Sequence, residues 1–349
     1  MRFPVVRVRG GPRDRGRSVG AALAEPISRS VSFYRGFLER RGIAPDRWGE
    51  MLGPYEAAAR KEVPDLVEEM EGMAEGAGVP LPDLMAANCW EELERLLELS
   101  PAPDRCTAFV VTGSEGTFLG HNEQWYAGDA GNVALLVERP DGEVPFASPT
   151  VVTCLPAVGM NAAGMAQGVM SLSHRDDGEG VPRVPVSRRS LQARDREDAF
   201  RRVTMPGRSG GYAYVIGRTG GDTTILETTS DSVAELHGEA GHTNHYLAPP
   251  LAEGGFTSEG SVSRLERLRT LLQDRPPSTP EDAMEILQDH EGEPQAICLH
   301  PDPEDGDEAA AVLFSMVCHL ESRRMWVALG NPCEAPYEKI PLPELWEAA

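Results

Sequence analysis

Lysine is scarce in this sequence, and its scarcity argues against lysine-based chemistry. Only Lys61 and Lys339 occur, neither within a motif, and the other basic residues are arginines. A Schiff-base mechanism is therefore disfavoured. Positive charge is scarce as well, since 33 lysines and arginines stand against 55 aspartates and glutamates, for a formal net charge of −22. A field of this sign repels polyanions, so no nucleic-acid partner is expected.

Long apolar runs are also missing. No stretch approaches the roughly 20 consecutive apolar residues that cross a bilayer. The first residues, Met1 to Val6, lack the hydrophobic region of a signal peptide. We therefore expect a cytoplasmic protein with no membrane partner. With 349 residues and 40% hydrophobic content, the chain can bury the core of one large domain or of two ordinary ones.

The six cysteines form no C-x-x-C pair, and their wide spacing does not indicate a disulfide framework. Cys298, Cys318 and Cys333 lie in apolar strand or loop contexts, for which packing is the favoured role. His242 and His245 invite a metal interpretation, but no third ligand has a suitable spacing. The sequence thus predicts no metal site.

Helical patterns dominate the first hundred residues. A short strand candidate at Val5 to Arg9 comes first, and helical segments follow at about 17–41, 46–61, 64–76 and 81–99. The run Ser100-Pro101-Ala102-Pro103-Asp104 then breaks the helical pattern and indicates an accessible linker.

From Cys106 onward the pattern changes to strands joined by turns. A hairpin is predicted first, and further strands follow in blocks that are interleaved with helices, which favours antiparallel sheets over βαβ units. Thr279 and Asp282 resemble a capping box at the start of one helix. The predicted strands include 107–112, 117–122, 133–138, 212–218, 223–228, 295–299, 311–319 and 323–329, and the predicted helices are 187–203, 262–273 and 280–289.

Cys106 stands at the change from helix to strand, directly after the linker. Taken alone, such a cysteine is more often a packing residue than a nucleophile. Cleavage of the peptide between Arg105 and Cys106 would, however, leave a thiol and a free α-amine on one residue. An unperturbed α-amine has a pKa of about 7.7–8.0, close to what a general base needs at neutral pH. One residue could then supply both nucleophile and base.

Several motifs in order along nearly the whole chain add weight to this hypothesis. They are Gly10, Gly16, Gly20, Arg105-Cys106-Thr107, Gly120-His121-Asn122-Glu123-Gln124-Trp125, Gly159-Met160-Asn161-Ala162-Ala163-Gly164, His242-Thr243-Asn244-His245, Ile297-Cys298-Leu299-His300-Pro301 and Gly330-Asn331-Pro332-Cys333. Together these motifs resemble the isopenicillin-N acyltransferase family, also called acyl-coenzyme A:6-aminopenicillanic acid acyltransferases, which are autoproteolytic N-terminal-nucleophile (Ntn) hydrolases.

The resemblance implies an α+β fold of four layers, αββα, in which two stacked, mainly antiparallel sheets follow a mostly helical N-terminal segment. It also implies an inactive precursor that cuts itself before Cys106. Residues 1–105 would form a small subunit and residues 106–349 the Ntn-hydrolase catalytic domain, which has 349 − 105 = 244 residues. The two fragments are expected to stay together as a heterodimer. The mature enzyme would cleave or form a linear amide through a Cys106 acyl-thioester.

The resemblance also gives roles to residues beyond Cys106. Asn244 matches an asparagine that helps to stabilise the oxyanion, a role that suits its amide donors. Gln124 stands where the family commonly has an aspartate that orients the amine of the matured cysteine, and it can accept a hydrogen bond but carries no charge. Asn122 and Glu123 join the candidate site. Glu123 would point across an extended strand, so a solvated surface carboxylate is an equally good interpretation of it.

Trp125, Arg264 and His245 are the candidate substrate-binding residues, Arg264 because it matches a Ser-x-x-Arg element of the family. No bound cofactor is expected, since the glycine-rich turns at 159–164 and 217–221 lack nucleotide-binding spacing. Acyl-coenzyme A remains a possible substrate. The expected partners are a small-molecule amide or acyl donor and an amine acceptor. Transfer and hydrolysis would share the thioester and differ in whether an amine or water reaches it.

Two other interpretations stay open at this point. A degenerate family member would keep the fold as an uncut binding or interaction protein, which the neutral Gln124 motivates. A papain-like hydrolase would need Cys106 near a helix N-terminus, with His242 or His245 as its partner. The strand-like sequence after Cys106 argues against that arrangement.

Overall fold

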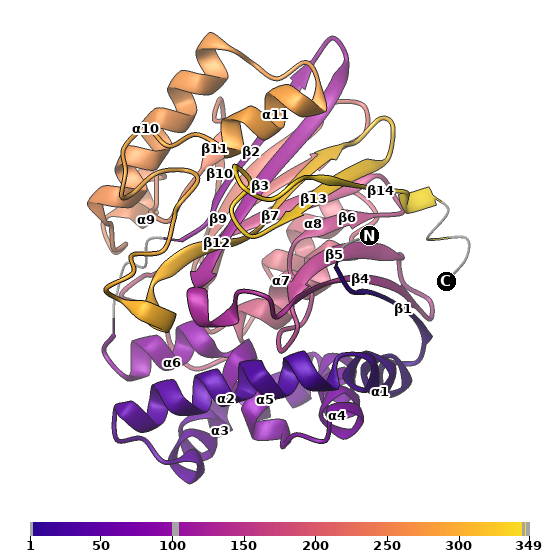
Figure 1. Cartoon of the computed structure of the whole chain (residues 1–349), viewed down its shortest axis with the longest axis vertical. Helices are drawn as coiled ribbons and strands as arrows, with labels where there is room; N and C mark the ends of the chain where they lie inside the picture. The colour runs from indigo at the N-terminus through magenta and orange to yellow at the C-terminus, as the bar shows by residue number, and fades with distance from the viewer. Residues whose placement is uncertain (1–2, 100–104, 344–345, 347–349) are drawn as a thin grey trace.

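The structure is a computed structural model that describes residues 3–99, 105–343 and 346. Its centre is a pair of stacked β-sheets (Figure 1). The larger sheet has eight strands, in the spatial order β1 (Val5–Gly10), β4 (Val133–Pro140), β5 (Phe146–Val151), β6 (Gly159–Asn161), β7 (Met165–Leu172), β8 (Gly211–Arg218), β9 (Asp222–Thr228) and β10 (Val233–Leu236). The smaller has six, in the order β11 (Gly241–His242), β2 (Thr107–Gly113), β3 (Gly116–Tyr126), β12 (Ala310–His319), β13 (Arg324–Leu329) and β14 (Glu338–Ile340).

The sheets face each other through β2 and β3 on one side and β7 and β8 on the other. Apolar side chains from both sheets form one buried cluster between them, which includes Val110, Leu119 and Val169. The backbones come close at Gly168, where an added Cβ would lie 3.0 Å from the Cβ of Ala108 and 3.1 Å from Nδ1 of His121. A residue without a side chain therefore lets β7 approach β2 and β3.

Helices cover the outer face of each sheet. Against the larger sheet lie α7 (Arg183–Leu191), which contacts β6 and β7, and α8 (Arg196–Val203), which contacts β9. Against the smaller sheet lie α10 (Glu259–Asp274) and α11 (Pro280–Leu287), seen at the top of Figure 1. Their Leu268 and Leu287 are fully buried against Phe109 and Phe118 of the sheet. The layer order is αββα, and the predicted fold class is confirmed.

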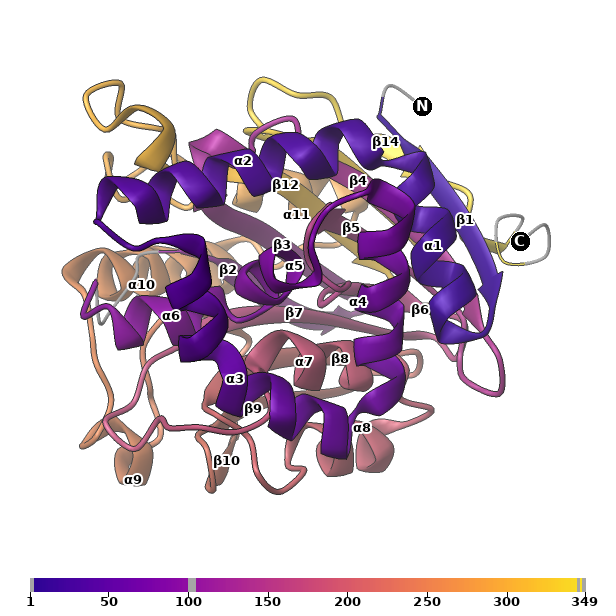
Figure 2. The ribbon, with the colours of Figure 1, turned by 90° about the horizontal axis from the view of Figure 1, so that it is seen from below.

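The N-terminal segment forms a separate helical layer at the bottom of Figure 1, and Figure 2 shows its helices spread over that side of the molecule. It also gives the larger sheet one of its two edge strands, since β1 pairs in parallel with β4. The division into fragments 1–105 and 106–349 stays a prediction. The helices are α1 (Pro12–Ala22), α2 (Ala24–Arg40), α3 (Pro45–Glu62), α4 (Pro64–Ala77), α5 (Leu81–Asn88) and α6 (Trp90–Leu96).

Helices α1 and α4 pack at a distance that only glycine allows. An added Cβ on Gly16 would lie 1.9 Å from the carbonyl oxygen of Glu69, and one on Gly72 would lie 2.2 Å from that of Arg13. Gly20 and Gly76 meet the opposite backbone in the same way. The glycine pattern of the first segment is therefore a packing device, because any side chain there would push the two helices apart.

Several predicted elements differ from those observed. The helix predicted at 17–41 is interrupted at Leu23, the one at 81–99 at Cys89, and the one at 187–203 between α7 and α8, where the Asp195 side chain caps a new helix by accepting from the amide of Asp198. Residues 295–299 form no strand. Instead, side-chain amides bind the carbonyl of Ile297. The capping box of Thr279 and Asp282 is confirmed.

Among the described residues, no helix combines the length and the apolar character that crossing a bilayer requires. The additional short helix α9 (Pro249–Ala252) has four residues.

Candidate active site around Cys106

Cys106 lies directly before β2, at the point where the chain enters the space between the two sheets. Its side chain is buried, and its Sγ lies 3.4 Å from Oε1 of Glu123 and 3.9 Å from the carbonyl oxygen of Gln124. Burial, and after it the negative charge of Glu123, raises the pKa of the Cys106 thiol well above its ordinary value. The thiol is therefore protonated at neutral pH and needs a proton acceptor before it can attack.

Glu123 places a carboxylate next to this thiol. It alternates along β3 with residues that point to the other face of the sheet, so it shares the inner face with His121. Nε2 of the buried His121 lies 3.0 Å from Oε2 of Glu123, which leaves Oε1 directed at the thiol. Sequence reasoning left Glu123 between a site role and a surface role. The structure places its carboxylate in contact with Cys106.

Asn122 and Gln124 lie on the opposite face of β3 and are not brought to the thiol by their side chains. The Asn122 amide donates to the carbonyls of Leu287 and Ile297, both at 2.9 Å. The Gln124 amide also donates to Ile297, at 2.9 Å. Side chains alternate along a strand, so Gln124 and its neighbour Glu123 point to opposite faces. The carboxylate near Cys106 therefore comes from Glu123 and not from position 124. Gln124 contacts the thiol only through its backbone carbonyl.

Arg264 binds the peptide that links Arg105 to Cys106. Its side chain is buried, and Nη1 donates to the carbonyl of Arg105 at 2.7 Å, to the carbonyl of Cys106 at 3.0 Å and to Oγ1 of Thr107 at 3.0 Å. The guanidinium reaches this position from α10, whose N-terminus is capped by the Ser258 hydroxyl. A positive, desolvated donor therefore faces the oxygen on which charge would develop if the thiol attacked this peptide.

Asn244 lies on the same side of that peptide. Its Oδ1 accepts from the backbone amide of Arg105 at 3.1 Å and from Nη2 of Arg264 at 3.2 Å. Its Nδ2 donates to the carbonyl of Ser171 at 3.1 Å. Two donors on Oδ1 fix the orientation of the amide group. In the uncut chain, Asn244 thus positions the backbone of Arg105 and the side chain of Arg264.

His242 and His245 are engaged in hydrogen bonds away from the thiol. His242 lies 2.8 Å from Oε1 of Glu227, and Nδ1 of His245 lies 2.7 Å from Oγ of Ser261. Burial, followed by the nearby His242, lowers the pKa of His245 to about 4. His245 is therefore neutral at physiological pH and helps to hold Ser261, which in turn accepts from the amide of Asn244 at 2.7 Å.

The side chain of Arg105 is held in a buried clamp of opposite charge and aromatic rings. Its guanidinium pairs with Glu94 and lies 3.8 Å above the centre of the Trp125 ring. Although burial opposes it, the charge of Glu94 raises the pKa of Arg105. Tyr126 donates to the same carboxylate at 2.5 Å. The residue before Cys106 is therefore anchored by its side chain as well as by its carbonyl.

Comparison with known proteins identifies the family. A family model described as acyl-coenzyme A:6-aminopenicillanic acid acyl-transferase matches residues 111–334, well over half of the chain. The chain belongs to this family. The family match includes Glu123, Asn244 and Arg264, and it begins five residues after Cys106 (111 − 106 = 5). Membership confirms the coarser part of the functional prediction, an enzyme of the acyltransferase kind.

No curated protein matches the sequence. Among solved structures, a variant of conjugated bile acid hydrolase from Clostridium perfringens has a TM-score of 0.46 and 11% identity, covering 69% of this chain and 94% of that one. Penicillin V acylase from Agrobacterium tumefaciens has a TM-score of 0.42 and 13% identity, covering 64% of this chain and 83% of that one. Similarity at this level transfers no site and no substrate to this member of the acyl-transferase family.

A cavity opens beside the Cys106 thiol of this acyl-transferase family member. Its lining is largely apolar, and its empty volume of about 620 Å³ includes space open to solvent. Glu91 lies at its border, where its carboxylate accepts from the hydroxyls of Ser171 and Tyr212. Burial raises the pKa of Glu91 to about 7. The lining includes Cys106, Glu123, Trp125, Val151, Cys154, Val169, Tyr212 and Phe314.

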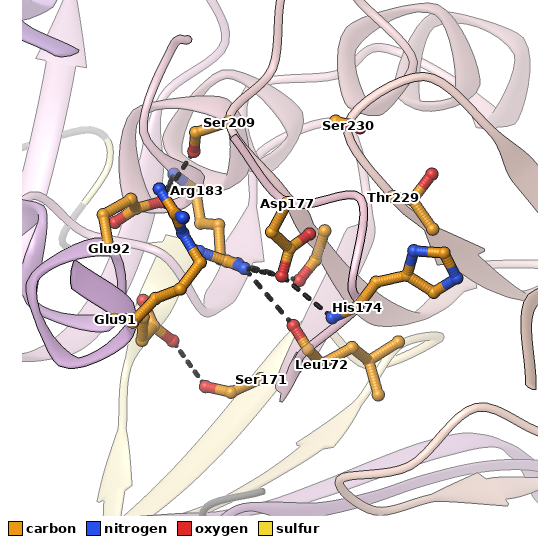
Figure 3. A network of polar contacts seen from close by, with 12 residues as sticks. Glu91, Glu92, Ser171, Leu172, His174, Asp177, Arg183, Ser209, Thr229 and Ser230 are labelled. Atoms are coloured by element: carbon orange, nitrogen blue, oxygen red, sulfur yellow. Dashed lines mark hydrogen bonds and ion pairs between the residues drawn. The ribbon is translucent and has the colours of Figure 1, made fainter. Parts of the chain in front are cut away.

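A second cavity shares Glu91 and Ser171 with the first. Figure 3 shows the polar network at its wall, in which Arg183 pairs with Glu92 at 2.9 Å and with Asp177 at 2.6 Å. One guanidinium thus lies between two carboxylates, which makes this wall polar. Cys106 lines the first cavity and not the second, and Glu91 and Ser171 lie between the two.

Sequence reasoning missed several of these residues for an identifiable reason. Glu91 and Glu94 lie in the predicted helix 81–99, where glutamates are ordinary surface residues, whereas the fold buries Glu94 and places Glu91 in the lining of the cavity. His121 lies in one of the matching motifs, which assigns it no role. Cys106, His121 and Glu123 also have ligand atoms within 4.8 Å of one another, which supplies only three ligands for a metal.

Proposed function

We propose that this protein is a cysteine Ntn enzyme that cuts itself before Cys106 and then cleaves or forms linear amides through a Cys106 acyl-thioester. One observation carries the proposal: the carbonyl of Arg105 lies 2.7 Å from the buried guanidinium of Arg264, while the thiol of the next residue lies 3.4 Å from a carboxylate. Nucleophile, proton acceptor and oxyanion donor thus surround a single peptide.

The first reaction is an N-to-S acyl shift. Glu123 takes the proton of the Cys106 thiol, and the thiolate attacks the carbonyl carbon of Arg105. Negative charge develops on the Arg105 oxygen, which Arg264 stabilises. The bond from this carbon to the Cys106 nitrogen breaks, and the nitrogen leaves as an amine after taking the proton from Glu123. Water then hydrolyses the thioester between residues 105 and 106.

Before cleavage the α-nitrogen of Cys106 is an amide and cannot accept a proton. The precursor therefore needs Glu123. After cleavage the α-amine is free, and its ordinary pKa of about 7.7–8.0 suits a general base near neutral pH. The clamp on Arg105 serves the first reaction by holding the acyl carbon next to the thiol. Nδ2 of Asn244 donates one hydrogen to the carbonyl of Ser171, and its second hydrogen is available to a substrate oxyanion together with Arg264.

The substrate is a small-molecule amide or acyl donor whose acyl group enters the apolar cavity beside the thiol. Acyl-coenzyme A fits this scheme as a donor and not as a resident cofactor. An amine acceptor gives transfer and water gives hydrolysis. The two fragments remain associated as a heterodimer, because β1 pairs with β4 and the helical layer shares a buried cluster with the larger sheet.

The deciding experiment is intact mass measurement with N-terminal sequencing of purified protein. We expect two fragments that begin at Met1 and Cys106, of 105 and 244 residues, and an uncut Cys106→Ala chain. Cys154→Ala is the matched control, since Cys154 lines the same cavity. It should be cut normally. The fragments are then tested for thiol-dependent hydrolysis of apolar acyl amides.

An uncut, folded wild-type chain without such activity would overturn the proposal and favour a degenerate binding protein. The neutral Gln124 motivates that alternative. Its side chain donates to the carbonyl of Ile297 on the far face of β3, so its lack of charge does not by itself make Cys106 unreactive.

The ionisation of Glu91 should limit the binding of apolar substrates. Because the pKa of its carboxyl is raised to about 7, the group is mostly neutral at pH 6 and mostly charged at pH 8. Burying a charged group against an apolar acyl chain is unfavourable. We expect the KM for an apolar amide to increase severalfold from pH 6 to pH 8 in the wild type and to stay nearly constant in Glu91→Gln. Equal KM profiles for both proteins would contradict this role.

A further inference from the structure

Four metal-ligating side chains meet at one point outside the Cys106 site. His290, Cys298 and His300 come from the segment between α11 and β12, and Cys333 comes from the loop between β13 and β14. One ligand atom of each residue lies within 4.8 Å of the others. No carboxylate is a member of this group. Two sulfurs and two imidazole nitrogens are the donor set of many structural zinc sites.

Four of the six distances between the donor atoms lie close to the edges of a zinc tetrahedron, and the other two are within 4.8 Å. Sγ of Cys298 and Sγ of Cys333 are 3.6 Å apart, and Nε2 of His290 and Nε2 of His300 are 3.2 Å apart. Bonds of about 2.3 Å for Zn–S and about 2.0–2.1 Å for Zn–N give tetrahedral edges of about 3.8 Å between sulfurs and about 3.3 Å between nitrogens.

Two of the four edges between nitrogen and sulfur agree as well. Nε2 of His300 is 3.2 Å from Sγ of Cys333 and 3.9 Å from Sγ of Cys298. These values bracket the edge of about 3.6 Å that a zinc tetrahedron has between sulfur and nitrogen. A disulfide does not explain the arrangement, because a sulfur–sulfur bond is about 2.05 Å long. Hydrogen bonds alone would not require all four soft donors to converge.

We propose that His290, Cys298, His300 and Cys333 bind one Zn²⁺ ion in a closed structural site. Four protein ligands leave no open coordination position, which distinguishes the site from a catalytic one. Neighbouring groups suit this role. The Asn331 amide lies 3.6 Å from Sγ of Cys298, where it donates to the sulfur, and Nδ1 of His300 lies 3.9 Å from Glu334.

The ion would hold residues 295–299 in place, a segment with few backbone hydrogen bonds. Residues 295–299 form no strand, yet the carbonyl of Ile297 accepts hydrogen bonds from the side-chain amides of Asn122 and Gln124 on β3. Cys298 is the next residue. Zinc binding would therefore fix the segment against which the outer face of β3 packs, and Glu123 projects from the inner face of the same strand. The inference stands independently of whether Cys106 is a nucleophile.

The spacing explains why the sequence indicated no such site. The ligands follow the pattern H-x₇-C-x-H-x₃₂-C, which contains neither C-x-x-C nor H-x₃₋₅-H. The prediction of no metal site rested on His242 and His245, and Cys298 and Cys333 were interpreted as packing residues. Only the fold brings Cys333 to the other three.

The test is elemental analysis of untagged, reduced protein, together with zinc affinity measured by chelator competition. The wild type should carry one zinc ion per chain, and Cys333→Ser should bind zinc at least about 100-fold more weakly. Cys333 is exposed, so this variant should fold. Cys154→Ser and Cys106→Ala are the controls and should keep the full zinc content, since neither residue belongs to the cluster.

Cobalt gives a second readout, because Co²⁺ bound by two thiolates shows a sulfur-to-cobalt charge-transfer band. We expect this band in the wild type and its weakening in Cys333→Ser. A reduced wild type that holds no zinc and takes up neither Zn²⁺ nor Co²⁺ would overturn the proposal. Unchanged zinc affinity in Cys333→Ser, or loss of zinc in Cys106→Ala, would place the ion elsewhere and overturn it too. Cys106→Ala also separates this inference from self-cleavage, since an uncut chain can still bind zinc.

Discussion

Replacement of Arg264 by methionine is expected to leave the precursor almost entirely uncut. The variant keeps a long side chain but loses the donor that lies 2.7 Å from the Arg105 carbonyl. Removing one oxyanion donor costs about 10²–10³ in rate in enzymes of known mechanism. Arg264 also orients Asn244. We therefore expect at least this loss, measured as the rate at which the fragment beginning at Cys106 accumulates after purification.

Arg269→Met is the matched control because it removes an arginine from the same helix. Arg269 pairs with Glu239 at the surface and should be dispensable for cleavage. Arg264→Lys keeps the charge and should retain part of the rate. Melting temperatures of all three variants separate a folding defect from a chemical one. Normal cleavage by a folded Arg264→Met chain would contradict the assigned role.

The sequence predicts the architecture well because strand and helix periodicity report local preferences. Neighbouring residues determine the β2–β3 hairpin, the capping box at Thr279 and strand β12. Helix boundaries were less predictable. The interruptions at Leu23 and Cys89 occur inside patterns that are continuous in sequence, and tertiary packing decides them.

The candidate site was only partly predictable, and the reason is the direction of side chains. Family motifs located Cys106, Asn244 and Arg264, and these residues do meet at one peptide. The same motifs drew attention to Gln124, whereas the strand register turns Glu123 toward the thiol. A change of one residue along a strand exchanges the two faces. No local pattern reveals which face will be inner before the second sheet is placed.

Distant contacts were outside the reach of the sequence altogether. Glu94 pairs with Arg105 although the predicted linker 100–104, which lies outside the described residues, separates them in sequence. Cys333 joins His290 across more than forty residues. Such pairs depend on the sheet topology, and composition and spacing do not encode them in a form that can be read from one sequence.

Replacement of Glu123 by glutamine is expected to have two opposite effects on Cys106. Loss of the proton acceptor should slow self-cleavage by about 10²–10⁴, the usual contribution of a general base. The thiol itself should become easier to ionise. The negative charge of Glu123, second only to burial, raises the pKa of the thiol in the wild type, so its removal lowers that pKa. Cys106 should then be alkylated at lower pH in the variant.

Both effects can be measured in one design. Cleavage rates are compared for the wild type, Glu123→Gln and the exposed control Glu115→Gln, which lies in the turn between β2 and β3. Alkylation of Cys106 by iodoacetamide, followed by peptide mass spectrometry, is compared between Arg264→Met and the double variant with Glu123→Gln, because both chains should stay uncut. A shift of this pH profile to lower values together with slower cleavage is specific to a carboxylate that accepts the thiol proton. Slower cleavage with an unchanged profile would instead assign Glu123 a purely structural role.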